Sequence, residues 1–160
     1  MFIVKAAFSE QVEWRTSPER AREFLNDLRN FAELMPGVES ITAQAGGVAR
    51  WVIRAEVPVV GSMRQAFAVA QAAAEPRRIE WSPAPGEQKN LLRYSAALED
   101  LGGRTRVRIE QRVEVRRQSP RELHLLAGLA GEGRLSAALQ SGVTEMMSTF
   151  LQRARAKLES

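Results

Sequence analysis

The sequence predicts an α+β fold in which a curved antiparallel sheet of about seven strands packs on a long C-terminal helix. Residues 2–14 alternate between apolar and polar side chains, and so do most residues from 38 to 117. A period of two is typical of strands with one buried face. From 135 to 158 the apolar residues recur every three or four positions, which indicates an amphipathic helix. A sheet with one apolar face must cover that face with helices.

A helix or a helix pair is expected after the first strand. Ser17-Pro18-Glu19 supplies an N-cap, a proline at the first helical position and an acid in the first turn. Apolar residues then step by three and four over Phe24–Met35, and a division near Asn30 would give two helices. Pro36-Gly37 ends the helix abruptly. Because large apolar side chains persist to its last turn, we expect this end to border a cavity, with Phe31, Leu34 and Met35 as rim residues.

Turn signals divide residues 38–117 into strands. Paired glycines at 46 and 102, the segment Pro58–Gly61 and the stretch SPAPGE at 82–87 favour turns between antiparallel strands. The clearest strand is Thr105–Arg116, in which apolar residues alternate with Arg and Glu. The other expected strands cover 49–57, 63–69, 79–81 and 92–98.

The C-terminal part is expected to be helical in two pieces. Ser119–Glu122 favours the start of a short helical segment, which the stretch GLAGEG at 128–133 interrupts before the long helix. The insert SPRELHLLAGLAGEGRLSAALQ is longer and more apolar than a simple turn. Its leucines and glycines favour a lid or a packed loop over a membrane anchor.

Composition limits the class of protein. A chain of 160 residues fits a single domain, here 1–160, with one core. The absence of cysteine excludes disulfides and Cys-ligated metals and favours a reducing compartment. We expect a cytoplasmic protein, because the N-terminal apolar run is too short for a signal peptide and no run approaches a membrane span. The formal charge of +4 raises the question of nucleic acid, but Arg and Glu are interleaved without stacking aromatics, so no nucleic-acid partner is expected.

Three stretches carry a resemblance to a known superfamily: FSEQVEWRTSPERAREFLNDLRNFAELMPGVESI, RTRVRIEQRVEV and VTEMMSTFLQRARAKL. Together they resemble the START-like, or SRPBCC, helix-grip superfamily, and particularly its polyketide cyclase/dehydrase branch and the branch associated with carbon monoxide dehydrogenase. The resemblance implies a cavity between the sheet and the terminal helix that holds a hydrophobic ligand, such as a lipid, a quinone or a polyketide-like compound. We expect no cofactor and no metal.

The candidate ligand-binding residues face inward on the predicted strands or lie on the apolar stripes of the helices. A few are polar, and we expect Gln65, Gln111 and the Tyr94 hydroxyl to orient a polar head group. The others would supply apolar contact. The full set is Phe31, Leu34, Met35, Trp51, Ile53, Gln65, Phe67, Trp81, Tyr94, Gln111, Val143, Met146, Met147 and Phe150.

Catalytic candidates are few. An inward carboxyl at Glu10 would have a raised pKa and could move a proton, and Tyr94 could assist. Alternatively, a β-bulge turns Glu10 to solvent and Tyr94 is an ordinary core residue. His124 is the only histidine, which excludes a His-rich metal site, and no motif places a nucleophile beside it.

The sequence therefore favours a non-catalytic carrier or accessory protein that binds a hydrophobic small molecule or a lipid, with a transient membrane or enzyme partner. One alternative is an enzyme of the polyketide cyclase, aromatase or dehydratase type that uses an inward carboxyl. Another is an assembly or accessory subunit of a redox enzyme, which only the likeness of residues 24–41 to the carbon monoxide dehydrogenase branch suggests. The oligomeric state is left open.

Overall fold

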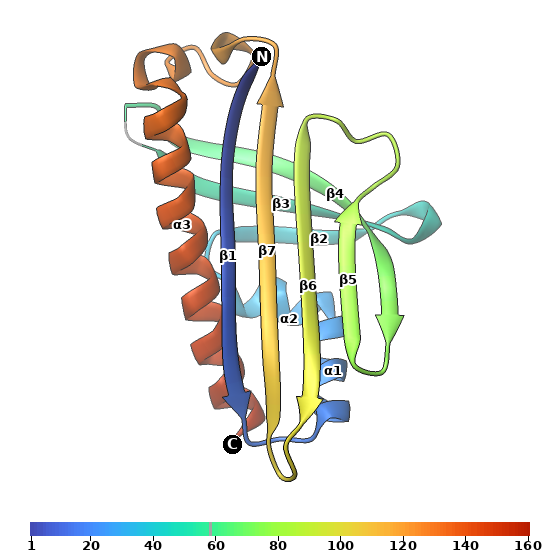
Figure 1. Cartoon of the computed structure of the whole chain (residues 1–160). Coiled ribbons are helices and arrows are strands. Elements are labelled where there is room, and N and C mark those ends of the chain that lie inside the picture. The colour runs from blue at the N-terminus through green and yellow to red at the C-terminus, as the bar shows by residue number, and fades with distance from the viewer. Residues whose placement is uncertain (58) are drawn as a thin grey trace.

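Seven antiparallel strands form one sheet in the computed structural model, which describes residues 1–57 and 59–160. The strands follow the sheet order β1-β7-β6-β5-β4-β3-β2 (Figure 1). Strands that lie side by side in the sheet are consecutive in the sequence, except for the pair β1 and β7. This arrangement confirms the predicted fold class. Pro58, in one predicted turn, lies outside the described residues. The strands are β1 (Phe2–Trp14), β2 (Val38–Ala43), β3 (Val48–Val57), β4 (Gly61–Glu75), β5 (Arg78–Pro83), β6 (Asn90–Asp100) and β7 (Thr105–Arg117).

The sheet is strongly curved, and β4 makes the bend. This strand of 15 residues pairs with β3 through its first part and with β5 through its last part. Its register with β5 shifts between Gln71 and Ala73, and a bulge of this kind bends a strand and increases its twist. In Figure 1 the strands β2 and β3 therefore run across the direction of β1, β7 and β6. The result is a concave inner face.

Two short helices follow β1, as one form of the prediction allowed. Helix α1 (Pro18–Asn26) begins after Ser17, whose hydroxyl accepts a hydrogen bond from the backbone N–H of Arg20 at 3.2 Å. Asp27 ends α1 and caps α2 (Leu28–Leu34) by accepting from the N–H of Arg29 at 3.0 Å. The break therefore falls at Asp27, because an Asx side chain competes well for the free N–H groups of a helix start.

The turn after α2 has the geometry that its sequence predicts. Met35 is extended and Gly37 has a φ of 86°, in the left-handed region that favours glycine. The Gly37 carbonyl accepts a hydrogen bond from the N–H of Arg54 at 2.8 Å, which fixes the turn against β3. A Cβ at Gly37 would lie 3.0 Å from the Arg54 carbonyl oxygen and 3.3 Å from Met146 on the terminal helix.

The long terminal helix α3 (Ala127–Leu158) begins earlier than expected and contains the predicted interruption. Gly131, within GLAGEG, has φ 81° and ψ 161°, a conformation that glycine alone adopts readily. Before α3, the single 3-10 turn η2 (Pro120–Glu122) replaces the expected capped helix, and a second such turn, η1 (Ala45–Gly47), precedes β3. Ser119 makes no capping hydrogen bond there. Instead, the Glu122 carboxylate accepts from the Gln118 N–H at 2.9 Å.

Helix α3 covers the free edge of β1 with polar side chains. The N–H groups of Ile3, Lys5 and Ala7 donate to Glu132 Oε1 at 2.6 Å, Ser136 Oγ at 3.2 Å and Gln140 Oε1 at 2.9 Å, respectively. Four helical residues rise about 6 Å and two strand residues about 6.6 Å, so the two elements stay in step over these contacts. An edge strand with paired backbone groups offers no template for further strands.

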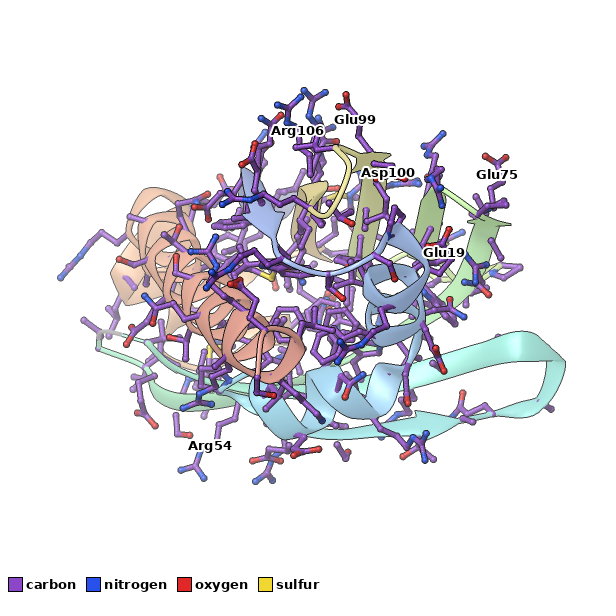
Figure 2. All side chains as sticks on the ribbon, turned by 90° about the horizontal axis from the view of Figure 1, so that it is seen from below. Glu19, Arg54, Glu75, Glu99, Asp100 and Arg106 are labelled. Atoms are coloured by element: carbon purple, nitrogen blue, oxygen red, sulfur yellow. The ribbon has the colours of Figure 1, made fainter. Side chains whose placement is uncertain are left out.

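Charged residues lie on the surface of the fold rather than between the sheet and the helices (Figure 2). Figure 2 shows charged side chains around the periphery of the fold, including Arg54, Glu99 and Arg106. Arg106 pairs with Glu99 at 3.1 Å on the outer face of β7, as the alternating pattern of that strand predicts. Within 1–57 and 59–160, no helix is both long and apolar enough to cross a membrane.

Two glycines near the start of α3 give matched tests of the interruption. A Cβ would meet nothing within 4 Å at either Gly131 or Gly133, so only the backbone distinguishes them. We expect Gly131→Ala to lower the free energy of unfolding by about 1–3 kcal/mol, because alanine strains that conformation. Gly133→Ala, in regular helix, should raise it by about 0.5–1 kcal/mol. Urea unfolding measures both, and equal effects would show that Gly131 is not strained by a side chain.

Candidate functional site

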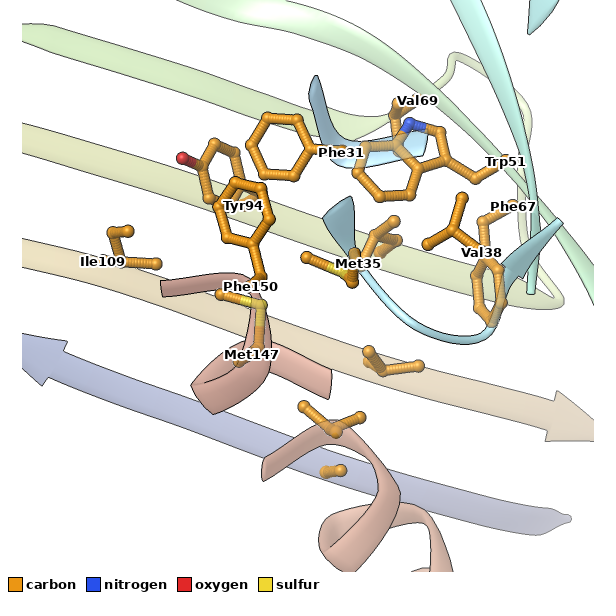
Figure 3. Close-up of a cluster of buried hydrophobic side chains, with 14 of the residues drawn as sticks. Phe31, Met35, Val38, Trp51, Phe67, Val69, Tyr94, Ile109, Met147 and Phe150 are labelled. Atoms are coloured by element: carbon orange, nitrogen blue, oxygen red, sulfur yellow. The ribbon is translucent and has the colours of Figure 1, made fainter. Parts of the chain in front are cut away.

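An aromatic cluster fills one part of the space between the sheet and α3 (Figure 3). Phe31 of α2 stacks on Phe150 of α3 with ring centroids 4.6 Å apart and an interplanar angle of 13°. Phe31 also contacts Tyr94 at 5.1 Å and Trp51 at 5.5 Å, and Phe24 stacks on the other side of Phe150 at 6.2 Å. All five rings are buried. This cluster packs the C-terminal half of α3 against α1, α2 and the sheet.

A cavity of about 90 Å³ lies under the N-terminal half of α3. Its floor comes from the inner faces of β1, β3, β4 and β7, and its roof comes from α3 and Leu123. Six predicted site residues line it: Ile53, Gln65, Phe67, Gln111, Val143 and Met146. The remaining lining residues are Val4, Ala55, Val57, Met63, Val113, Val115, Leu123, Leu135, Ala138, Leu139 and Gly142.

The other predicted site residues lie outside the cavity lining. Phe31, Trp51, Tyr94 and Phe150 belong to the aromatic cluster, and Met35 and Met147 are buried in the same core. Leu34 and Trp81 are partly buried and pack against the core. The Leu34 carbonyl accepts a hydrogen bond from Arg153 at 3.0 Å, which ties the end of α2 to α3.

The lining residues that the sequence reasoning missed carry a recognisable signal. Val113 and Val115 share the inward parity of Gln111 on β7, and Val4 lies on the inward side of β1. Gly142 is a small residue on the apolar stripe of α3, between Leu139 and Met146. Such a gap in a helical stripe marks a place where the helix leaves space unfilled.

Amide groups supply the polarity of the cavity lining. Gln111 is 5% exposed and forms no side-chain hydrogen bond with any residue that the structure describes. Gln65 Oε1 accepts from Asn90 Nδ2 at 3.1 Å and from an Arg117 terminal nitrogen at 3.0 Å. Burial lowers the pKa of Arg117 from its ordinary value, while the nearby carboxylates of Glu122 and Glu87 act in the opposite direction. The guanidinium stays charged at neutral pH.

Neither of the two catalytic candidates, Glu10 and Tyr94, lines the cavity. Glu10 is exposed, although β1 pairs with β7 in an unbroken register that places it opposite Ile109. No bulge is needed to expose it, because the pairing of β1 with β7 is regular on both sides of Glu10. The Tyr94 hydroxyl is buried without a hydrogen-bond partner in the described chain, and desolvation raises its pKa far above the ordinary value. It therefore remains protonated and cannot act as a base.

The segment between β7 and α3 contributes one residue to the cavity lining. Leu123 lines the cavity, which agrees with a covering segment. Leu125 and Leu129, by contrast, are 78% and 73% exposed. The Nδ1 of His124 accepts from the Leu126 N–H at 3.0 Å, a local turn contact. Among residues 1–57 and 59–160, no three His, Cys, Asp or Glu side chains gather to form a metal site.

Adjacent methionines on α3 distinguish the cavity from the core. Met147 is fully buried in the core, whereas Met146 is half-buried and lines the cavity. We expect Met147→Ala to lower the free energy of unfolding by about 2–5 kcal/mol, and Met146→Ala by less than about 2 kcal/mol, because fewer packed atoms lose contacts at the cavity wall. Chemical denaturation of both variants tests this expectation, and a larger loss at Met146 would contradict the placement of Met147 in the core and Met146 at the cavity wall.

Solved structures share this architecture at low sequence identity. The di-domain ARO/CYC protein BexL from the BE-7585A biosynthetic pathway superposes with a TM-score of 0.68 at 16% identity, over 98% of this chain and 51% of that one. The Zhui aromatase/cyclase from Streptomyces sp. R1128 gives 0.61 at 16% identity, over 94% and 93% of the two chains. A START superfamily protein from Mycobacterium smegmatis gives 0.53 at 21% identity, over 87% and 97%.

At these identities the structural likeness establishes the fold. The present chain spans about half of the length of the di-domain protein. No curated protein matches the sequence. The family described as "Polyketide cyclase / dehydrase and lipid transport" matches residues 5–159. Because this match covers nearly the whole described fold, the chain belongs to the polyketide cyclase/dehydrase and lipid transport family.

Proposed function

We propose that this protein binds a hydrophobic small molecule or a lipid in the cavity beneath α3 and acts as a carrier or accessory binding protein. The observation that carries the proposal is a lining of apolar side chains in which Gln65 and Gln111 are the polar members. An apolar wall with a few placed polar groups is the usual composition of a small-molecule site. Each ligand CH₂ buried there would contribute about 0.8 kcal/mol before the costs of association.

The size of the cavity requires the roof to move. A volume of about 90 Å³ is below the roughly 150 Å³ that admits benzene and well below the roughly 300–1,000 Å³ of typical ligand pockets. The floor is a hydrogen-bonded sheet, whereas the roof is the half of α3 that lacks the aromatic anchor. A lipid-sized ligand therefore enters by displacing the N-terminal half of α3 and the segment around Leu123.

The chemistry of the lining supports binding over catalysis. The family includes cyclases and dehydrases, whose proton transfers need a titratable group within hydrogen-bond reach of the substrate. Among the described residues, the lining offers amides and apolar groups, while Glu10 and the Tyr94 hydroxyl lie elsewhere. An amide orients a ligand without exchanging protons at neutral pH. We therefore favour the carrier over the enzyme.

A cavity-blocking variant tests the location of the site. Gly142 lines the cavity and a Cβ there would meet nothing within 4 Å, so Gly142→Phe places a benzyl group in the free volume. We expect it to weaken binding of the fluorescent apolar probe N-phenyl-1-naphthylamine by at least about tenfold, because the benzyl group occupies the space that the probe would otherwise enter. Fluorescence titration measures the dissociation constant.

The matched control is Ser141→Phe, on the exposed face of the same helical turn. It should bind the probe as the unaltered protein does, and far-UV circular dichroism should show both variants folded. Equal probe affinity in Gly142→Phe and the unaltered protein would move the site away from this cavity. No binding by the unaltered protein, together with no co-purifying ligand in native mass spectrometry, would refute the proposed function.

A further inference from the structure

A chain of hydrogen bonds fixes the orientation of the Gln65 amide. It begins at the carbonyl of Ala66, which accepts from Asn90 Nδ2 at 2.8 Å. Because a backbone carbonyl can only accept, this contact determines which end of the Asn90 amide carries the N–H₂ group. The same Nδ2 donates to Gln65 Oε1 at 3.1 Å.

Arg117 fixes the same amide from a second direction. One terminal nitrogen of its guanidinium donates to Gln65 Oε1 at 3.0 Å, and the other donates to the backbone carbonyls of Arg116 at 2.7 Å and Lys89 at 3.3 Å. A guanidinium has donors and no acceptor, so a flipped Gln65 would face two donors with its own N–H₂ group. The Gln65 carbonyl therefore stays on the Asn90 and Arg117 side.

This arrangement leaves a donor without a partner at the cavity. Gln65 Nε2 forms no hydrogen bond with the described residues, and the side chain lines the cavity. Gln111, also in the lining and 5% exposed, is likewise without a side-chain partner in that part of the chain. Gln65 is partly buried and Gln111 is buried. Because most amides in such positions are hydrogen-bonded, two without a protein partner in one cavity lining leave donors available to a ligand.

We propose that this cavity selects apolar ligands that carry a hydrogen-bond acceptor oxygen, either a neutral carbonyl or a carboxylate, and that Gln65 Nε2 donates to that oxygen. This inference rests on the proposed binding function and adds the chemical class of the polar group. Gln111 supplies a second amide that no protein contact orients, so it adapts to the rest of the ligand.

Electrostatics favour an acceptor at this point. The positive guanidinium of Arg117 lies behind the Gln65 carbonyl and polarises the amide, which strengthens its N–H groups as donors. A ligand ammonium group would instead meet N–H donors and a like charge in a poorly solvated site. The same residues therefore attract an oxygen acceptor and reject a cationic donor.

Two ligands of nearly the same shape isolate the acceptor. In nonan-2-one the branch is a carbonyl oxygen, and in 2-methylnon-1-ene it is a CH₂ group. Calorimetric titration gives the ratio of their dissociation constants for each protein. We expect Gln65→Met, which keeps the length of the side chain but removes the donor, to shift this ratio against the ketone by about three- to tenfold. Gln71→Met, at an exposed position on the same strand, should leave the ratio unchanged.

A second variant keeps the test decisive if Gln65→Met does not fold. Gln65→Glu preserves the shape and gives Arg117 a carboxylate partner, but it replaces the free donor with an acceptor. The ratio should shift against the ketone here as well. An unchanged ratio in both variants, or the same shift in Gln71→Met, would overturn the assignment of Gln65.

Further probes distinguish a carboxylate ligand from a neutral carbonyl ligand. They also distinguish failure of the acceptor proposal from failure of the proposed binding function. Tighter binding of nonanoate than of nonan-2-one, weakened by high salt, would indicate a carboxylate ligand, and the reverse order would indicate a neutral carbonyl. Equally tight binding of nonylamine would overturn the selection of an acceptor. If N-phenyl-1-naphthylamine binds but neither oxygen probe does, the acceptor proposal fails alone. If no probe binds, the binding function fails with it.

Discussion

The stack of Phe31 on Phe150 is the contact on which the arrangement of this protein depends. It joins α2, which enters from one end of the curved sheet, to the last turns of α3, and Phe24, Trp51 and Tyr94 pack around it. Aromatic pairs in this geometry contribute about 0.5–1.5 kcal/mol beyond the burial of their area. Hydrogen bonds from Arg153 and Lys157 to α2 reinforce the same junction. The C-terminal half of α3 therefore has one position.

The N-terminal half of α3 meets a different requirement. Its polar residues Glu132, Ser136 and Gln140 satisfy the free edge of β1, so the strand edge helps to fix the position of this half. The side chains that face the floor include the small residues Ala138 and Gly142. One helix cannot follow a straight edge and also fill a curved face. The unfilled remainder is the cavity.

Sequence patterns predicted the strands, the helix pair and the long helix because each depends on local periodicity and capping. They did not predict which part of the inward face is filled. Phe31 and Phe150 carry the same apolar signal as Phe67 and Val143, and only the stacking of distant segments removes the first two from the cavity lining. For Glu10 the sequence left an inward and a solvent-facing position open, and the structure has it exposed within an unbroken register.

The orientation of Gln65 shows the same limit for polar groups. Its strand position predicts that it faces inward, but the free end of its amide is decided by Asn90 on β6 and Arg117 at the end of β7. Those partners belong to the rigid sheet, whereas the residues that would move aside for a ligand belong to the roof. The sheet therefore selects the polar group of the ligand, whereas the roof formed by α3 and Leu123 controls whether the ligand can enter. A change in the roof can alter the size of the ligand without altering the donor that recognises its oxygen.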